Sequence, residues 1–325
     1  TYNPSFFTSR GIVIDTSSDS SVVMVVYCPE TQRNRQIYDS IFDDLQYVGL
    51  ERRITGGLVY TTKENIQTIA VVTGHGEKSV PYFQLIMNDN GFDVKYINLS
   101  EFDKIPDFVN ILLIVNPTRT YSSADIEKID AFLSNGELLG KHLMVFSDLD
   151  AISNPLLEEY LKEWGLEFGT EAVFDTKNSY AISNAYEPFL KLTYEEDALF
   201  TTLLEGNYYL EVRLGKAREV KSLFSSEDSI STYTLVKTFD TAFSRYIANT
   251  NISASEYQNI KKTDTDKAGP FSIMTLAAKA RYEGTTRISS NIIACGSSSF
   301  MDDYYLSNVD GSKQTSSESM VELVK

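Results

Sequence analysis

The sequence has few of the side chains that bind transition metals or form disulfides. It contains two cysteines, Cys28 and Cys295, and two histidines, His75 and His142, in 325 residues. The cysteines lack the CxxC spacing of a zinc or redox site and are too few for a disulfide scaffold, so they form one bridge or none. Zinc sites usually need several imidazoles or thiolates, and we therefore expect no metal site.

Long apolar runs and a surplus of basic residues are also missing. No stretch approaches the roughly 18 consecutive apolar residues of a membrane-spanning helix, and no signal peptide opens the chain. Lys and Arg number 29 against 45 Asp and Glu, which gives a formal net charge of −16. Such a surface repels phosphate backbones, because nucleic-acid binding depends on basic side chains, so no nucleic-acid partner is expected.

The first part of the chain, residues 1–50, reads as a β-rich segment. Residues 22–27 form an apolar, β-branched run, and residues 35–38 can return beside it as the second strand of a hairpin. We expect this segment to be the remnant of a further domain, followed by an α/β domain over residues 51–325. That domain begins with a helical pattern over residues 50–60.

Buried strands alternate with amphipathic helices after residue 67. The helices begin at Ser79 with Pro81, at Ser122 with Asp125 in a capping box, and at Asn154 with Pro155. Gly91, Gly136 and Gly165 are their predicted C-terminal ends. The strands between them are predicted at residues 68–73, 94–99, 111–115 and 142–147.

This alternation predicts a mostly parallel, doubly wound α/β sheet, either flavodoxin-like or like class I glutamine amidotransferases. The C-terminal portion is less regular. It has predicted strands at residues 208–212, 232–237 and 287–295, the last of which can join the same sheet, and a polar loop at residues 248–269.

Several segments carry a family likeness. Residues 66–150 contain TIAVVTGHGE, ILLIVNPTRTYSSADIEKIDAFLSNG and LMVFSD, and NYYLEVRLGKAREV, SLFSSEDSIS and NIIACGSSSFMDD follow later. In this order, over residues 50–310, they resemble the GldG-like family of ABC-transporter auxiliary proteins, which is associated with gliding motility in some bacteria. The chain departs from the family at Gly136-Glu137, where members usually have a Gly pair.

The resemblance implies a location and partners. A domain of this family lies at the extracytoplasmic face of the bacterial cell membrane, is anchored by transmembrane segments, and works beside ABC permease and ATPase subunits or another membrane protein. The family has no established catalytic residues to carry over. A chain that begins at Thr1 and ends in a polar tail is compatible with a domain excised from such a protein, and tag removal explains it equally.

Gly74, His75, Gly76 and Glu77 directly follow the first buried strand. Open α/β sheets bind ligands at this position, beyond the carboxyl ends of their strands. His75 and Glu77 can therefore clamp a ligand or act as an acid–base pair. The same residues also suit a tight strand-to-helix turn, because the glycines permit it and Glu77 is favourable near a helix N-terminus.

Asn116, Thr118 and Arg119 follow the next buried strand and can line the same crevice, with Arg119 as an anion contact. A capped turn is the alternative interpretation of these residues, and the one that we favour. Neither loop has the glycines of a dinucleotide fingerprint or the glycines and lysine of a P-loop, so no cofactor is expected.

Catalytic signatures are missing as well. No GxSxG elbow occurs, and Cys295, followed by Gly296 and Ser297, is the nearest approach to one. We interpret Cys295 as a buried structural thiol. Acidic residues in loops read as solvated: Asp148, Asp150, Asp302 and Asp303.

The sequence thus predicts a non-catalytic module that contacts a partner subunit or an exported substrate. A hydrolase or amidotransferase-like enzyme on the same fold and a small-ligand sensor domain stay open as alternatives.

Overall fold

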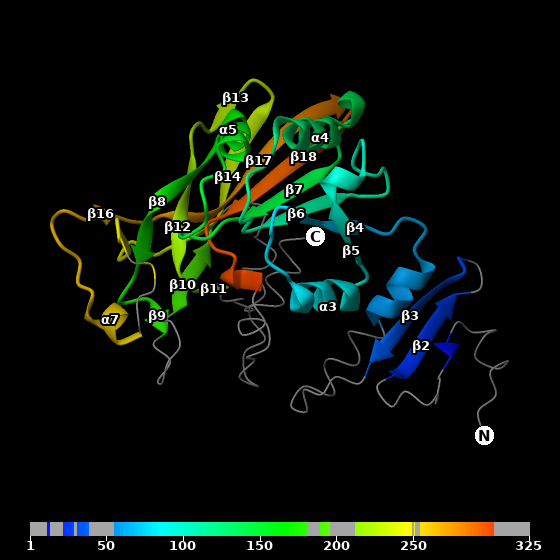
Figure 1. The fold of residues 1–325 in the computed structure, drawn as a ribbon, viewed down its shortest axis with the longest axis horizontal. Coiled ribbons are helices and arrows are strands. Elements are labelled where there is room, and N and C mark those ends of the chain that lie inside the picture. The colour runs from blue at the N-terminus through cyan, green and yellow to red at the C-terminus, as the bar shows by residue number, and fades with distance from the viewer. Residues whose placement is uncertain are drawn as a thin grey trace.

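The centre of the molecule is a large mixed sheet, shown in the computed structural model of Figure 1. Its strands follow the order β11-β10-β14-β17-β18-β7-β6-β4-β5, with β13 beside β14 and β9 beside β10. The structure describes residues 12–13, 22–28, 31–38, 55–180, 189–195, 212–248, 250 and 254–301.

Five neighbouring strands of this sheet are parallel. Three of them, at residues 68–73, 111–115 and 142–146, consist largely of buried apolar residues, which suits strands covered on both faces. The five strands are β4 (Thr68–Thr73), β5 (Asp93–Asn98), β6 (Ile111–Val115), β7 (His142–Phe146) and β18 (Thr286–Cys295). The predicted strands of this part are therefore confirmed, including the return of the C-terminal strand to the same sheet.

Helices lie on the two faces of the parallel part. Helix α3 (Pro81–Asp89), between β4 and β5, packs in one apolar core. Helices α4 (Ser123–Ser134), after β6, and α5 (Pro155–Glu163), after β7, pack in the other. Because β4 leads to β5 on one side and β6 leads to β7 on the other, the chain changes direction between β4 and β6.

The rest of the large sheet is antiparallel. It is built from β17 (Ser272–Glu283), β14 (Ile230–Lys237), β10 (Phe189–Tyr194), β11 (Val212–Leu214), β13 (Ser226–Glu227) and β9 (Ser179–Tyr180). The α/β class is confirmed. The flavodoxin-like, doubly wound form is not confirmed, because antiparallel strands rather than helical crossovers extend the sheet.

A second, four-stranded sheet lies beside the antiparallel part. Its order is β12 (Ala217–Ser222), β8 (Leu166–Phe174), β15 (Phe243–Arg245) and β16 (Lys267–Ala268). Val220 of β12 shares an apolar core with Ala277 of β17, and the Thr275 hydroxyl donates to the Val220 carbonyl at 2.9 Å. Helix α7 (Ala254–Asn259) lies within residues 248–269, so the prediction of a polar loop over this stretch was wrong for the residues of the helix.

The N-terminal hairpin is confirmed as β2 (Val22–Cys28) and β3 (Arg33–Tyr38), with β1 (Ile12–Val13) beside β2. It contacts the α/β part through Arg35, whose guanidinium lies 3.8 Å from the Tyr60 ring centroid and donates to the Phe92 carbonyl at 3.0 Å. Tyr60 belongs to a helix over residues 55–62, as predicted.

Some predicted helix ends differ in detail. Val80, not Ser79, precedes α3, and its side chain makes no cap hydrogen bond. Asn135, not Gly136, is the C-cap of α4, in the left-handed conformation. Of the predicted strand 208–212, only Val212 is described, in β11. The described residues also include three short 3-10 helices: η2 (Leu99–Glu101), η3 (Asn135–Glu137) and η4 (Ser299–Met301).

Within the described ranges, no helix combines the length and apolar character that crossing a bilayer requires.

Candidate functional site

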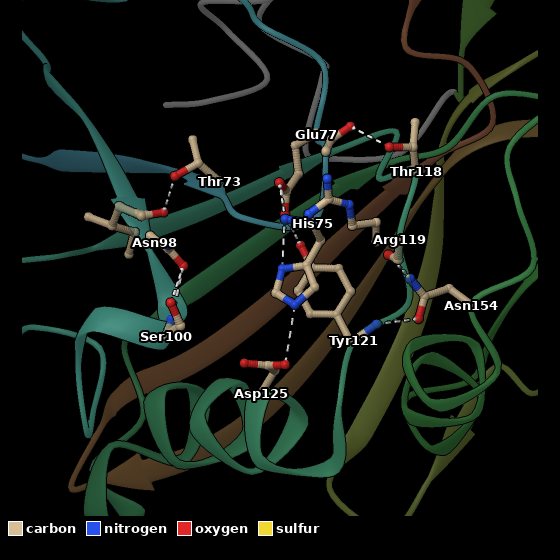
Figure 2. Close-up of polar contacts among 12 residues, drawn as sticks. Thr73, His75, Glu77, Asn98, Ser100, Thr118, Arg119, Tyr121, Asp125 and Asn154 are labelled. Atoms are coloured by element: carbon tan, nitrogen blue, oxygen red, sulfur yellow. Dashed lines mark hydrogen bonds and ion pairs between the residues drawn. The ribbon is translucent and has the colours of Figure 1, made fainter.

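Two loops meet at the carboxyl edge of the parallel strands, where the chain changes direction. The loop after β4 and the loop after β6 contain all seven predicted site residues. The Thr118 and Arg119 N–H groups donate to the His75 carbonyl at 3.0 and 2.8 Å, and the Thr118 hydroxyl donates to the Gly76 carbonyl at 3.2 Å. The two loops therefore lie side by side, as the sequence predicted (Figure 2).

The glycines allow this close approach. Gly76 has φ of +71°, and a Cβ added there would lie 2.1 Å from the Thr118 hydroxyl oxygen. Gly74 has φ of +111°, and a Cβ added there would lie 2.6 Å from the Asn98 side-chain oxygen. Both positions combine a left-handed backbone with a close neighbour, so a side chain at either one would displace the loop.

His75 lies between two carboxylates and an aromatic ring (Figure 2). Its ring stacks on Tyr121 with centroids 4.1 Å apart and planes inclined by 14°. Its Nε2 is 3.3 Å from Asp125 Oδ2. Its Nδ1 is 3.4 Å from Glu77 Oε1 but outside hydrogen-bond geometry. The imidazole is thus held by its own loop, through Glu77, and by the segment after β6, through Tyr121 and Asp125.

Glu77 is the buried centre of this group, with its side chain 1% exposed. Its Oε2 accepts the His75 N–H at 2.8 Å, and its Oε1 accepts the Tyr121 hydroxyl at 2.6 Å. Burial, followed by the neighbouring Glu77 carboxylate, raises the pKa of Tyr121 well above its ordinary value. Tyr121 therefore keeps its proton at neutral pH and remains a donor to Glu77.

Asp125 has two roles. It completes the predicted capping box of α4, since its Oδ2 accepts the Ser122 N–H at 2.9 Å and the Ser122 hydroxyl at 2.6 Å. The same oxygen faces His75. Burial opposes ionisation of Asp125, but the bonds from Ser122 and the proximity of His75 outweigh it and lower the pKa.

A second polar group connects the carboxyl ends of four parallel strands. Asn116, left-handed at φ of 44°, accepts the Asp148 N–H through its side-chain oxygen at 3.1 Å. Asp148 accepts both the N–H and the hydroxyl of Ser298, the latter at 2.7 Å, and Lys78 donates to the Ser298 hydroxyl at 3.1 Å. The prediction that Asp148 is simply solvated was wrong, because Ser298 is buried and binds it.

The two cysteines are free and buried. Burial is the main cause that raises the pKa of the Cys295 thiol to about 12, and its sulfur donates to the Ser297 carbonyl at 3.3 Å. A thiolate nucleophile at this position is strongly disfavoured at neutral pH. In the part of the chain that the structure describes, no three His, Cys, Asp or Glu side chains gather as metal ligands would.

The site is therefore a set of polar contacts within the protein, with exposed groups on its outer side. The contacts join His75 to Glu77, Tyr121 and Asp125, and Tyr121 to Glu77. These contacts are sufficient to explain the four residues as parts that hold the turn together. Thr118 and Arg119 are exposed. A ligand or partner contact at the two loops stays a prediction.

Sequence reasoning missed Tyr121 and Ser298 as members of the site. Tyr121 stands one residue before the capping serine, and nothing in its local pattern indicates the stack on His75. Ser298 lies 150 residues from the Asp148 that it binds, so only the folded sheet brings them together.

Residues 67–188 match the family model described as an ABC-type uncharacterized transport system, and this stretch contains both loops. The ABC-transporter auxiliary family predicted from the sequence is confirmed over these residues. No curated protein sequence matches the chain significantly.

Two solved structures are similar in shape. The first, described as the mmIFT52 N-terminal domain, is 13% identical, has a TM-score of 0.52, and the alignment covers 79% of this chain and 96% of that one. This likeness shows the fold alone. The second is PurLQS from Thermotoga maritima, 14% identical with a TM-score of 0.37, over 80% of this chain and 100% of that one.

Proposed function

We propose that this chain is the extracytoplasmic, non-catalytic domain of an auxiliary component of an ABC-type transport system. In this proposal, the loops after β4 and β6 bind a membrane partner, such as the permease, or the exported substrate. The observation that carries it is the family match over residues 67–188, which spans both loops.

The geometry supports a binding role for these loops. They lie at the position where open α/β sheets bind ligands. Hydrogen bonds from Thr118 and Arg119 to His75 join them, so they offer a surface that needs little ordering when a partner binds. Thr118 and Arg119 are among the exposed side chains of this surface.

The hydrolase alternative has less support. Cys295 is 0% exposed and its raised pKa disfavours the thiolate. Ser298 is also 0% exposed, and its hydroxyl proton is donated to Asp148. A broad hydrolase screen that compares wild type with His75→Ala and Cys295→Ala tests this alternative, and activity abolished by either change would establish it.

Site-specific photocrosslinking in the full-length protein tests the binding role. We expect a photoreactive residue at Thr118 to crosslink to the permease or the exported substrate. Tyr282, 71% exposed near the end of β17, is the matched control position, because it lies at the opposite end of the parallel strands. Crosslinks from 282 but not from 118, or none from 118 in an active transporter, would contradict the proposal.

The location needs its own measurement. Fusing alkaline phosphatase after the domain in the full-length protein should give an active reporter, because that enzyme needs an oxidising compartment for its disulfides. An inactive alkaline phosphatase fusion together with an active cytoplasmic reporter fusion at the same position would place the domain inside the cell.

A further inference from the structure

The pair Asn-Gly occurs twice in the sequence, each time at the C-terminal end of a helix. Asn90, followed by Gly91, is the C-cap of α3, and Asn135, followed by Gly136, is the C-cap of α4. Such a pair is chemically reactive, because glycine has no side chain to hinder attack of its amide nitrogen on the asparagine side-chain carbonyl. Whether a pair reacts in the folded protein depends on how freely its glycine can move.

The two asparagines are held alike. The side-chain amide of Asn90 donates to the Ile86 carbonyl at 2.8 Å, and that of Asn135 donates to the Leu139 carbonyl at 2.8 Å. Their backbone N–H groups also close the last turn of each helix, from Asn90 to the Ile86 carbonyl and from Asn135 to the Ala131 carbonyl. A difference in reactivity must therefore come from the glycines.

The two glycines have different surroundings. Gly91 is buried, its N–H donates to the Asn88 carbonyl at 3.1 Å, and a Cβ added to it would lie 2.7 Å from a Val59 methyl carbon. Gly136 is exposed, and among the residues that the structure describes a Cβ added to it would meet nothing within 4 Å. Gly136 can therefore rotate toward Asn135 without disturbing packed atoms, whereas Gly91 must first break a hydrogen bond and leave Val59.

We propose that Asn135 is a site of spontaneous deamidation in the folded protein and that Asn90 is protected from it. The Gly136 amide nitrogen bonds to Cγ of Asn135, and the side-chain nitrogen leaves as ammonia with the proton that Gly136 gives up. Water then opens the resulting succinimide ring at either carbonyl, which produces aspartate or isoaspartate. The reaction requires only water, and the inference is independent of the proposed function.

The product changes a corner that supports β17 and β18. A carboxylate at residue 135 lies at the negative end of the α4 dipole and no longer donates to the Leu139 carbonyl. Beside it, the Arg281 guanidinium of β17 donates to the Leu138 carbonyl at 3.0 Å. Isoaspartate also adds a carbon atom to the main chain at this point. Deamidation therefore weakens the attachment of the β17–β18 hairpin to the segment after α4.

Peptide mapping by mass spectrometry, during incubation of the native protein at mildly alkaline pH, tests the proposal. The product of Asn135 should form about tenfold or more faster than that of Asn90, because freeing Gly91 costs at least the roughly 1.4 kcal/mol that a factor of ten represents. In urea, where neither pair is packed, the two rates should become similar. The rate at Asn135 should also rise with pH, since the amide nitrogen attacks after losing its proton.

Two variants separate the chemistry from its consequence. Gly136→Ala keeps the asparagine but places a methyl group beside the attacking nitrogen, so deamidation should slow; the open space there leaves only the cost of a left-handed backbone. Asn135→Asp reproduces one product directly. Its melting temperature should be a few degrees below that of the wild type, because it loses a hydrogen bond and opposes the helix dipole.

Equal rates at Asn90 and Asn135 in the folded protein would overturn the inference. So would the lack of product at Asn135 under conditions in which the urea-unfolded chain reacts, or an undiminished rate in Gly136→Ala. A wild-type melting temperature for Asn135→Asp would refute the weakened attachment of the hairpin.

Discussion

The hydrogen bond from Tyr121 to Glu77 should be the strongest single polar contact of the site. Its oxygens are 2.6 Å apart, Tyr121 is 2% exposed and the Glu77 side chain 1%. Tyr121→Phe removes the hydroxyl while keeping the ring that stacks on His75. A hydrogen bond to a charged group contributes roughly 1.5–3 kcal/mol, so we expect the free energy of unfolding to fall by about 2 kcal/mol.

Tyr160→Phe is the control for this change. The Tyr160 hydroxyl donates to Asp130 at the longer distance of 3.2 Å, and Asp130 is exposed, so water can replace the donor. We expect a loss of only about 0.5 kcal/mol there. Equilibrium urea unfolding followed by circular dichroism measures both, and with a slope of about 3 kcal/mol/M the Tyr121→Phe midpoint should fall by about 0.7 M.

A double-mutant cycle with Glu77→Gln identifies the partner. In the Glu77→Gln background, Tyr121→Phe should cost clearly less than alone, because both changes break the same contact. Equal losses for the two tyrosines, or fully additive effects of Tyr121→Phe and Glu77→Gln, would refute the assignment of Glu77 as the acceptor that matters.

Three further predictions concern single positions. Gly76→Ala should lower the free energy of unfolding by about 2 kcal/mol or more, because the added Cβ meets Thr118. Gly284→Ala has open space around its Cβ at φ of +62°, so it should lose only the roughly 1 kcal/mol that a left-handed backbone costs a residue other than glycine, and urea unfolding compares the two variants. Cys295 should resist iodoacetamide at pH 8 in the native protein and react in urea, read by peptide mass spectrometry, since its pKa is raised to about 12. Burial, with a smaller contribution from Lys141, lowers the pKa of His142 in the folded protein. The neutral imidazole therefore supports folding fully above the unfolded pKa of about 6.5, and this stability is lost as the pH falls toward the lower folded pKa. Between pH 7 and 5 the free energy of unfolding of the wild type should fall by up to about 2 kcal/mol more than that of His142→Gln, as measured by urea unfolding at each pH.

Local sequence pattern was enough for the parallel part of the fold. Residues 111–115 are uniformly apolar, and the structure has a strand with those bounds. The capping box at Ser122 was also readable, because it depends on residues three apart. These signals are local and strong, so tertiary packing did not override them.

The antiparallel part was harder to predict. Strand β17 mixes apolar and polar residues without clean alternation, since one end is buried in the sheet and the other projects beyond β14. Helix α7 is short and polar, and its Tyr257 packs with Phe174 and Phe243 from distant segments. Only those tertiary contacts distinguish it from a loop.

The candidate site was predicted in part for the same reason. Parallel strands in sequence order placed the loops of His75 and Arg119 at one edge. The pairing of His75 with Asp125 depends on how α4 is set against that edge, and the bond between Asp148 and Ser298 joins the ends of β7 and β18, which are 150 residues apart in the sequence. The two residues of each pair are 50 and 150 residues apart in the sequence, and contacts at such distances produce no periodic pattern of side chains from which they could be predicted.

The position of β18 has a consequence for how this protein is made. Residues 291–295 pair with residues 142–146, so one edge of β7 stays bare until a segment about 150 residues further along the chain has left the ribosome. A fragment cut at the limits of the family match, residues 67–188, would expose that bare apolar edge to other chains and aggregate. Expression boundaries should therefore reach past Cys295, and a chaperone that covers β7 during synthesis would raise the yield.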